Sequence, residues 1–361
     1  MTPRQPSNPR PDQTAVCKVG CTLAMALASL LTVSIAPAEI EILPLDQHLN
    51  GSETLAQLGD LTERARAATF LVYEQGEQGG EPVALGTWVG HGLGLTKNSQ
   101  LDPEAELWLA TDPDQPRHPA TLITRNEALD LALVRWNPAT ATAEIKAVRL
   151  PDEPTKVDMG HWLVSATLDA RRPVMLGVVA AAQRAVPSSG AILGLELSEP
   201  DDDGKVRIIN ASPGGPAYAA GLRRGDVLTR FNDQGVSDGR ALMRFQRRLK
   251  PGDWVRLSVL RGSAEQSLDF RVRLVSRSQV ERFWFGEHWT EGGISPRSDD
   301  YPDSIHHSTP VPAHQMGGAV FDLEGRWLGL NIARFDRVTT FALPVASFRT
   351  WLEQQLEKLS E

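Results

Sequence analysis

The stretch "ASPGGPAYAAGLRRGDVLTRFND" (residues 211–233) has the most specific local pattern in the chain. A Pro-Gly-Gly-Pro turn ends in Pro216, which presets φ for the first position of a short helix. The alanines that follow allow this helix to lie close to a sheet. Gly221 is expected to end the helix in the left-handed conformation, with Leu222 packing back onto it. The stretch therefore predicts a turn, a short helix and a strand in a compact α+β unit.

Strand-like and helical runs surround this stretch between about 190 and 275, and together they resemble the PDZ domains of bacterial HtrA/Deg-type proteases. The resemblance implies a loop whose backbone N–H groups bind the C-terminal carboxylate of a peptide, which then adds a strand to the sheet edge. The helix expected at 238–249 would form the other wall of the groove, unless its apolar residues only pack the core. The implied peptide-binding residues are Ile192, Leu193, Gly194, Leu195, Leu242 and Phe245.

Short strand-like runs lie on both sides of this unit, from Thr69 to about 184 and again after 304, and they predict an all-β barrel or sandwich. The runs "ALGTWVGHGLGLTKNSQL" (84–101), "RNEALDLALVRW" (125–136) and "SIHHSTPVPAHQMGGAVFDLEGRWLGLNIA" (304–333) resemble the trypsin-like domain of the same proteases. The resemblance implies a mainly β fold class: two antiparallel trypsin-like β-barrels with an inserted α+β PDZ domain. The PDZ domain would interrupt the second barrel.

The expected organisation has five parts. They are a signal peptide at 1–38, an N-terminal helix with the first barrel and the start of the second at 39–186, a PDZ domain at 187–275, a linker with an aromatic cluster at 276–303, and the rest of the second barrel with a C-terminal helix at 304–361. The N-terminal helix is predicted over 52–68, with Ser52 as its cap. The aromatic cluster "RFWFGEHW" (282–289) either packs at the junction between barrel and PDZ domain or forms a partner-binding patch.

The resemblance also assigns the catalytic positions, and two of the three are changed. Ser99 stands at the histidine position, Asp130 at the aspartate position and Met316 at the serine position. His314 replaces the glycine that shapes the oxyanion hole. A thioether has no proton to lose, and a hydroxyl cannot act as a general base near neutral pH. We therefore expect no functional catalytic site and no proteolysis.

Two alternatives remain. The first is an active serine-type endopeptidase with a rearranged site, in which Ser308 works with His306 or His307 or in which Ser99 is the reactive serine. The second is a structural scaffold subunit that assembles with homologous proteases.

No metal or cofactor is expected, because no histidine spacing fits a ligand pattern. The acidic runs "EPDDDG" (199–204) and "SDD" (298–300) are interpreted as solvated loops.

The first 38 residues predict export. Basic residues precede the apolar run "TLAMALASLLTVSIA" (22–36), and Ala36-Pro37-Ala38 fits a cleavage site. Fifteen apolar residues are short for a membrane span, although an uncleaved anchor is the alternative. Both cysteines, Cys17 and Cys21, lie in this segment, so the mature chain would have no disulfide and no membrane span.

The charge of the chain limits its partners. The whole sequence has a net charge of −8, and no long basic run indicates a nucleic-acid surface. We expect an exported periplasmic or extracellular protein that binds peptide or protein C-terminal tails as an adaptor, sensor or chaperone-like protein. A homo-oligomer, or an assembly with homologous proteases, is compatible with the resemblance.

Overall fold

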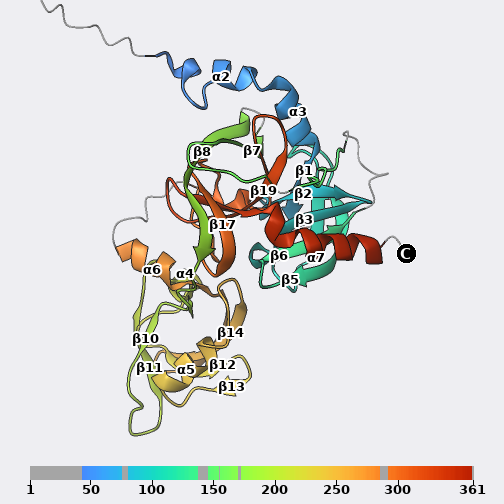
Figure 1. The fold of residues 1–361 in the computed structure, drawn as a ribbon. Helices are drawn as coiled ribbons and strands as arrows, with labels where there is room; N and C mark the ends of the chain where they lie inside the picture. The colour runs from blue at the N-terminus through green and yellow to red at the C-terminus, as the bar shows by residue number, and fades with distance from the viewer. Residues whose placement is uncertain are drawn as a thin grey trace, which may run out of the picture. The chain divides into compact units, whose positions relative to one another are not determined.

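The computed structural model describes residues 43–74, 80–136, 145–153, 155–169, 172–284 and 292–359 (Figure 1). The expected signal peptide at 1–38 lies outside these residues. Among the helices described, none has the length and apolar character that crossing a membrane requires.

The N-terminal helix expected over 52–68 is two helices. After η1 (Leu45–Gln47), the helices are α2 (Ser52–Ala56) and α3 (Gly59–Ala67). The N-cap residue of α2 is Gly51, and no side chain caps this helix end. The prediction of Ser52 as the cap was therefore wrong. Gly59 begins the second helix, and glycine is a poor residue for continuing a helix. Leu61 and Ala65 turn the apolar side of α3 into the core.

Six antiparallel strands close the first barrel in the order β1-β2-β3-β6-β5-β4. The strands are β1 (Thr69–Tyr73), β2 (Ala84–Gly90), β3 (Leu93–Lys97), β4 (Leu107–Ala110), β5 (His118–Asn126) and β6 (Leu131–Arg135). The short helix η2 (Asn98–Gln100) follows β3. Phe70 and Trp88 fill the barrel with ring centroids 4.2 Å apart, and Gly86 leaves room for the Phe70 ring.

A second closed barrel has the order β17-β20-β19-β18-β7-β8 and combines strands from both sides of the PDZ-like segment. Its strands are β7 (Trp162–Asp169), β8 (Arg172–Val186), β17 (Tyr301–His307), β18 (Ala319–Phe321), β19 (Trp327–Arg334) and β20 (Thr340–Pro344). The expectation of two antiparallel barrels is confirmed. Helix α7 (Val345–Lys358) follows, and its Phe348 packs on Trp327.

The segment between these strands forms a separate sheet in the order β10-β11-β12-β14-β15, with β13 paired to β12, and a small sheet of β9 and β16. The strands are β9 (Ala191–Ile192), β10 (Leu195–Leu197), β11 (Val206–Ala211), β12 (Val227–Phe231), β13 (Gln234–Gly235), β14 (Trp254–Arg261), β15 (Gln266–Arg273) and β16 (Val275–Ser276). The helices are α4 (Pro216–Ala219) and α5 (Gly239–Gln246). Gly221 has the predicted left-handed conformation at φ 103°, and the N–H of Leu222 donates to Ala217 O.

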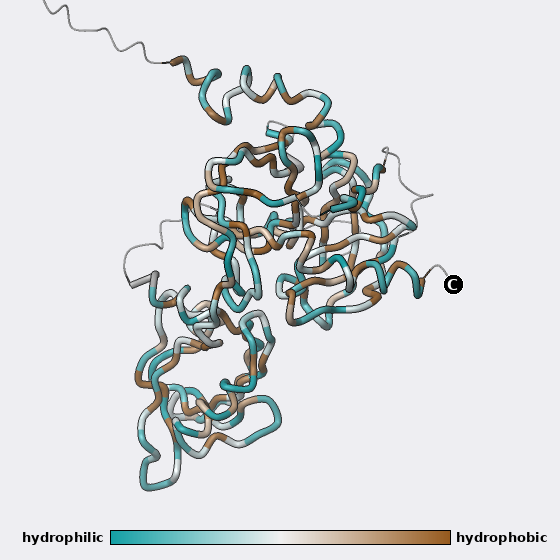
Figure 2. Tube along the Cα trace, viewed as in Figure 1, coloured by the Kyte–Doolittle hydropathy of each residue, from teal (hydrophilic) through white to brown (hydrophobic). Residues whose placement is uncertain are grey.

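The segment expected to be an irregular linker contains helix α6 (Arg277–Trp284). The side chains of the aromatic cluster at 282–289 lie outside the described residues. Figure 2 shows hydrophobic residues along the strands of both barrels and of the PDZ-like sheet. One core cluster joins the two barrels, with Leu95 and Leu133 from the first and Leu330 and Leu343 from the second.

The interior of the second barrel contains a buried histidine. His307 is fully buried, and its Nδ1 lies 2.8 Å from Thr309 Oγ1. Burial lowers the pKa of His307 to about 4, so the imidazole is neutral in the folded protein. His306 packs against Phe341 with tilted rings whose centroids are 4.3 Å apart. Both histidines therefore belong to the packing of the barrel.

We predict that His307→Gln reduces the acid sensitivity of folding. As the pH falls below about 6.5, His307 binds a proton in the unfolded chain but stays neutral in the folded protein. The stability that depends on the neutral imidazole is therefore fully present above this pH and is lost as the pH falls toward 4. A pKa lowered from 6.5 to about 4 corresponds to a loss of about 3 kcal/mol. Urea unfolding at several pH values measures this loss of stability. The exposed His91, changed to Asn, is the control; equal acid slopes for wild type and His307→Gln would contradict the prediction.

Candidate functional site

The structure brings Ser99 and Asp130 together at the edge of the first barrel. Ser99 lies in η2, directly after β3, and Asp130 lies in the turn before β6. The Asp130 carboxylate accepts hydrogen bonds from Ser99 N at 2.7 Å and Ser99 Oγ at 2.9 Å. Asp130 has φ 59°, a left-handed conformation that aspartate tolerates better than most residues. The Ser99 hydroxyl thus donates to a carboxylate, and among the described residues no hydrogen bond joins it to an imidazole.

A lysine that the sequence reasoning missed neutralises Asp130. Lys97 ends β3, is fully buried, and places Nζ 2.6 Å from Asp130 Oδ2. Nζ also donates to Tyr301 Oη at 2.9 Å and to Arg297 O at 3.1 Å. Burial lowers the pKa of Lys97 to about 8, against the attraction of the Asp130 carboxylate, so the amine is still charged at pH 7. The ammonium is the counterion that an imidazolium would supply in a working triad.

Met316 is fully buried, and its loop is tied to the first barrel through the backbone. Leu85 N donates to Met316 O at 2.9 Å, and Thr87 Oγ1 donates to Gly317 O at 3.0 Å. Gly317 has φ 99°, and a Cβ there would lie 2.0 Å from Leu85 O. The glycine is therefore required by the close approach of the two barrels, whatever residue stands at 316.

The turn before Met316 uses the Met316 amide, one of those that an oxyanion hole would need. Residues Ala313–Gln315 form η5, and the N–H of Met316 donates back to Ala313 O at 3.4 Å. Gln315 N donates to Pro312 O at 2.9 Å. The His314 side chain is exposed. The Met316 N–H is therefore not a free donor in this turn.

A loop of the PDZ-like unit covers Ser99. Residues 250–253 connect α5 to β14, and a Cβ on Gly252 would lie 2.3 Å from Ser99 Cβ. Gly252 has φ 98°, and its N–H donates to Leu274 O at 2.8 Å. Between this loop and the Ser99–Asp130 pair remains a cavity of about 310 Å³. Ser99 itself is only 6% exposed.

Ion pairs hold the same unit against the first barrel. Arg271, on β15, makes two hydrogen bonds to the carboxylate of Asp102. Arg256, on β14, lies 2.9 Å from Glu104. The arginine beside it holds the pKa of Asp102 below its usual range, although burial of the carboxyl acts in the opposite direction. Both acidic partners lie in the loop that follows η2, which carries Ser99.

A stacked group of aromatic and cationic side chains reinforces these pairs. The guanidinium carbons of Arg271 and Arg273 lie 4.5 Å and 4.6 Å from the centre of the Trp254 ring. Arg273 also donates from Nη2 to Gln100 O at 3.1 Å. Each guanidinium thus combines a cation–π contact with a contact to the first barrel.

The acidic run at 298–300 was wrongly expected to be a solvated loop. Ser298 and Asp299 are 0% and 3% exposed. Asp299 Oδ2 accepts from Ser189 N at 2.9 Å, and Asp299 Oδ1 accepts from Ser276 Oγ at 2.8 Å. The run is therefore a buried tie between both ends of the PDZ-like unit. Among the described residues, no group of acidic, histidine or cysteine side chains could hold a metal.

Arg297, in the same segment, is buried at the junction and was also missed. Its guanidinium donates to Glu127 O at 2.6 Å, Ala128 O at 3.1 Å and Asp300 O at 2.6 Å. It fixes the turn that carries Asp130, while its own carbonyl accepts from Lys97. The residue is a positioning group for the Lys97–Asp130–Ser99 cluster.

The serine and histidine of the rearranged site are not joined. Ser308 Oγ accepts a hydrogen bond from Val178 N at 3.1 Å. His306 Nε2 lies 2.9 Å from Ser304 Oγ, and His307 Nδ1 contacts Thr309. These contacts use the hydroxyl and both imidazoles in barrel packing.

The expected peptide groove lies between β10 and α5. Leu193 is fully buried, and neither its N–H nor that of Gly194 donates to another described residue. Gly194 has φ 74°, and a Cβ there would lie 3.0 Å from Gly215 Cα. Beyond this loop, β10 pairs with β11 alone among the described strands, so its other edge is open.

On the helix side, the expected contact residues face the core. Leu242 is 4% exposed, and Phe245 stacks on Phe231 with ring centroids 5.7 Å apart. The side of α5 nearest β10 is marked by Gly239, whose Cβ would lie 3.9 Å from Leu197 Cβ. Met243 follows one helical turn later on that side and is 53% exposed.

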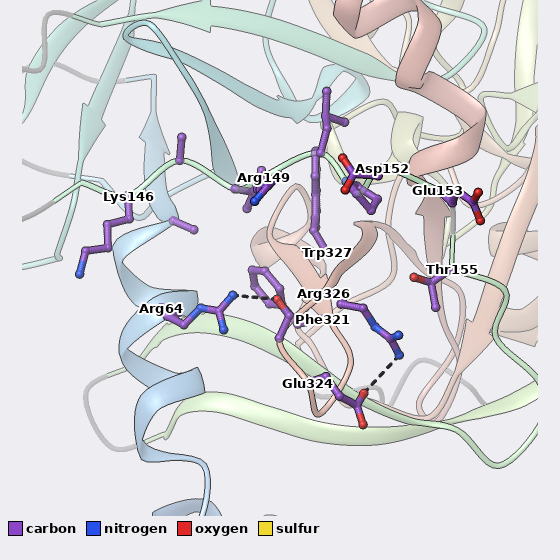
Figure 3. A pocket seen from close by; sticks show the side chains of 16 residues that line it. Arg64, Lys146, Arg149, Asp152, Glu153, Thr155, Phe321, Glu324, Arg326 and Trp327 are labelled. Atoms are coloured by element: carbon purple, nitrogen blue, oxygen red, sulfur yellow. Dashed lines mark hydrogen bonds and ion pairs between the residues drawn. The ribbon is translucent and has the colours of Figure 1, made fainter.

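A cavity of about 650 Å³ lies elsewhere, between α3, residues 146–153 and the hairpin of β18 and β19 (Figure 3). Its charged side chains have both signs, and several are already paired. Arg64 donates to Gly325 O, and Arg326 donates to Glu324, as the dashed lines in Figure 3 mark. The cavity shares no lining residue with the Ser99–Asp130 pair.

We predict that Lys97→Met strongly destabilises the protein, because it leaves the Asp130 carboxylate buried without a counterion. The expected loss is about 3–5 kcal/mol in the free energy of unfolding. Adding Asp130→Asn should recover part of this loss, since the remaining amide is uncharged. Chemical denaturation measures both. The partly exposed pair of Lys205 and Glu265 is the control, because Lys205→Met should change stability far less. If the double variant lost as much free energy of unfolding as the two single variants added together, the proposed role of Lys97 as counterion would be contradicted.

Comparison with known proteins agrees with the middle unit. Residues 191–272 match the family profile of the PDZ domain. No curated protein matches the chain in sequence.

Solved structures similar to the chain include three proteases. The HtrA-type protease AlgW with a tripeptide has 16% identity and a TM-score of 0.27, over 60% of this chain and 96% of that one. The serine endoprotease from Yersinia pestis has 14% identity and a TM-score of 0.27, over 61% and 97%. The MamO protease domain from Magnetospirillum magneticum, in its apo form, has 14% identity and a TM-score of 0.37, over 80% and 96%. The closed barrels and the matched profile together make this chain a trypsin-like double-barrel protein that contains a PDZ domain.

Proposed function

We propose that the chain is an exported, catalytically inactive trypsin-like protein whose PDZ domain binds the C-terminal tails of peptides or proteins. The observation that carries the proposal is the open edge of β10 beside the undonated N–H groups of Leu193 and Gly194. A peptide carboxylate accepts hydrogen bonds from such N–H groups, and the peptide backbone then pairs with the strand edge. Its role would be that of an adaptor, sensor or chaperone-like protein.

The proposed groove is lined by apolar residues of β10 and by one flexible side chain of α5. Leu195 and Leu197 lie on β10 and pack against the core of the domain. The exposed thioether of Met243 stands on the side of α5 marked by Gly239. Methionine adapts its shape easily, so Met243 suits contact with an apolar terminal side chain. We therefore place the ligand contact on Met243, with Leu242 below it and Phe245 in the core.

The proposal that catalysis is absent rests on three groups. Ser99 donates to Asp130, Met316 has no acidic proton, and the Met316 N–H is used within its own turn. Acyl transfer needs a nucleophile, a base and an oxyanion hole in one place. The covering loop at 250–253 further limits the approach of a peptide to Ser99.

Export and the domain limits are part of the same proposal. The segment at 1–38 has the features of a secretory signal, which would place the mature chain in the periplasm or outside the cell. We propose 187–275 as the PDZ domain, within the strands that close the second barrel.

We predict that free-acid peptides bind and that their amidated forms bind at least tenfold more weakly, which is about 1.4 kcal/mol. Amidation removes the charge that the Leu193 and Gly194 amides would hold. Calorimetry with a peptide library that ends in apolar residues measures it. Met243→Glu should weaken binding as well, whereas Ile209→Glu, at an exposed apolar residue on β11, should not. Binding that is indifferent to amidation would overturn the carboxylate site.

We also predict that a fluorophosphonate probe for active serines does not label the folded protein. Among the described residues, the Ser99 hydroxyl bonds to the Asp130 carboxylate and the Ser308 hydroxyl accepts from a backbone amide. Mass spectrometry of the treated protein measures labelling, with trypsin as the positive control. Labelling that disappears in Ser99→Ala or Ser308→Ala would support the rearranged endopeptidase instead.

A further inference from the structure

Helix α5 and the residue that ends it carry a row of arginine side chains. Arg240, Arg244 and Arg247 stand at positions i, i+4 and i+7, so they project from one side of the helix. All three are exposed. Among the described residues, no hydrogen bond, ion pair or ring contact joins any of these three guanidinium groups to another side chain. The row therefore offers three positive charges to a ligand.

This row is unfavourable for the helix by itself. Like charges four residues apart destabilise a helix, and residues 239–250 contain five basic residues and no acidic one. The chain as a whole is acidic, with 45 aspartates and glutamates against 37 lysines and arginines. Acidic residues in the same row would have stabilised the helix. The missing negative charge is therefore best supplied by a partner.

The direction of α5 places the row along the proposed peptide groove. At the start of the helix, a Cβ on Gly239 would lie 3.9 Å from Leu197 Cβ, where β10 ends. The chain after the helix approaches the other end of the groove. Gly252 N donates to Leu274 O at 2.8 Å, and β16, which follows, pairs with β9, directly before the loop at 193–194. The helix thus runs from the end of β10 toward the carboxylate loop.

A bound peptide would run in the opposite direction to β10. Its carboxylate would lie at the N–H groups of Leu193 and Gly194, before the strand begins, so its preceding residues would extend toward Leu197. The strand has three residues, and each advances about 3.3 Å. The third and fourth residues from the C-terminus of the peptide would therefore reach the end of β10, where Arg240 follows Gly239 on the helix.

We propose that the PDZ groove selects acidic C-terminal tails, and that Arg240, Arg244 and Arg247 provide this selectivity. The ligand class is a peptide with an apolar last residue and with aspartate or glutamate at the third and fourth residues from its C-terminus. Arg240 is placed beside these acidic side chains, and the other two arginines continue the positive row toward the carboxylate. This inference rests on the proposed PDZ function and adds the charge of the ligand.

The acidic side chains of the same two elements leave the row unneutralised. Glu196 lies on the opposite face of β10 from Leu195 and Leu197, which pack against the core. The carboxylate of Asp238 caps α5 by accepting from Ala241 N at 2.6 Å. The positive row therefore sets the charge on the helix side of the groove.

The test measures the binding of labelled peptides to the full chain by fluorescence anisotropy. The first peptide is fluorescein-Gly-Ser-Gly-Ser-Glu-Glu-Ala-Val with a free carboxylate. The others have two glutamines or two lysines in place of the glutamates, or an amidated C-terminus. The glutamine peptide should bind about fivefold more weakly than the first, as expected for the loss of two exposed ion pairs. The lysine peptide should bind more weakly still, and the preference should shrink in about 1 M NaCl, because salt screens exposed charges.

Arg240→Gln combined with Arg244→Gln removes two charges and keeps residues that favour a helix. The preference for the glutamate peptide should fall below about twofold, while the glutamine peptide binds as it does to the wild type. Arg224→Gln combined with Arg230→Gln is the matched control. Both of these arginines are exposed, lie on β12 or in the turn before it, and are separated from β10 by β11. The control changes the net charge equally and should keep the full preference.

Each outcome separates this inference from the PDZ function on which it rests. Equal binding of the glutamate and glutamine peptides, with dependence on the free carboxylate retained, would overturn the acidic selectivity alone. A preference that falls equally in the control would assign it to net charge and would also overturn the role of the row. Equal binding of the amidated and free-acid glutamate peptides would place the ligand outside the groove. Binding of none of the peptides would contradict the PDZ function, and the selectivity with it.

Discussion

The buried pair of Lys97 and Asp130 is the interaction on which the rest of this site depends. A carboxylate without exposed surface needs a positive charge and hydrogen bonds, and here it has the ammonium at 2.6 Å together with Ser99 and Tyr301. In a working triad this aspartate orients an imidazole, which takes the proton of the nucleophile and later donates it to the leaving group. Here Lys97, at the end of β3, supplies the positive charge at the same carboxylate oxygen that accepts from Ser99 Oγ. The aspartate thus has a structural role that does not depend on catalysis, because the ammonium is its partner.

The inserted PDZ domain accounts for how the cleft is filled. Its loop at 250–253 covers Ser99, and Arg271 holds Asp102 in the loop that follows Ser99. The returning segment supplies Arg297, which fixes the Asp130 turn, and Ser295, which pairs with the edge of β19. The insertion therefore brings its own covering elements to the place where a protease would receive its substrate. The position of the insertion and the filling of the cleft are thus one structural feature.

Part of this architecture could be predicted from sequence, and the limits are physical. Gly221 and Leu222 adopt the expected helix ending because backbone rules at glycine are local. The barrels were predicted from strand texture and resemblance, and both close as expected. Lys97 was missed because nothing in the run "LGLTK" shows that its last residue points at a carboxylate 33 positions away. Asp299 was predicted to be solvated and Arg297 was not singled out, because the partners of both come from distant segments. On α5, helical spacing left open which apolar residue faces the groove, and only the packing of Phe245 on Phe231 separated it from Met243.

The central claim is that the fold has been kept while binding resides in the PDZ domain instead of the barrel cleft. Amide NMR of the full chain, titrated with a peptide that has a free C-terminal carboxylate, tests this most directly. The account predicts a progressive downfield shift of the Leu193 and Gly194 amides, with the amides of Ser99 and Met316 unchanged. Shifts confined to Ser99, Asp130 and the Met316 loop, with Gly194 unmoved, would contradict it and return the ligand to the barrel cleft.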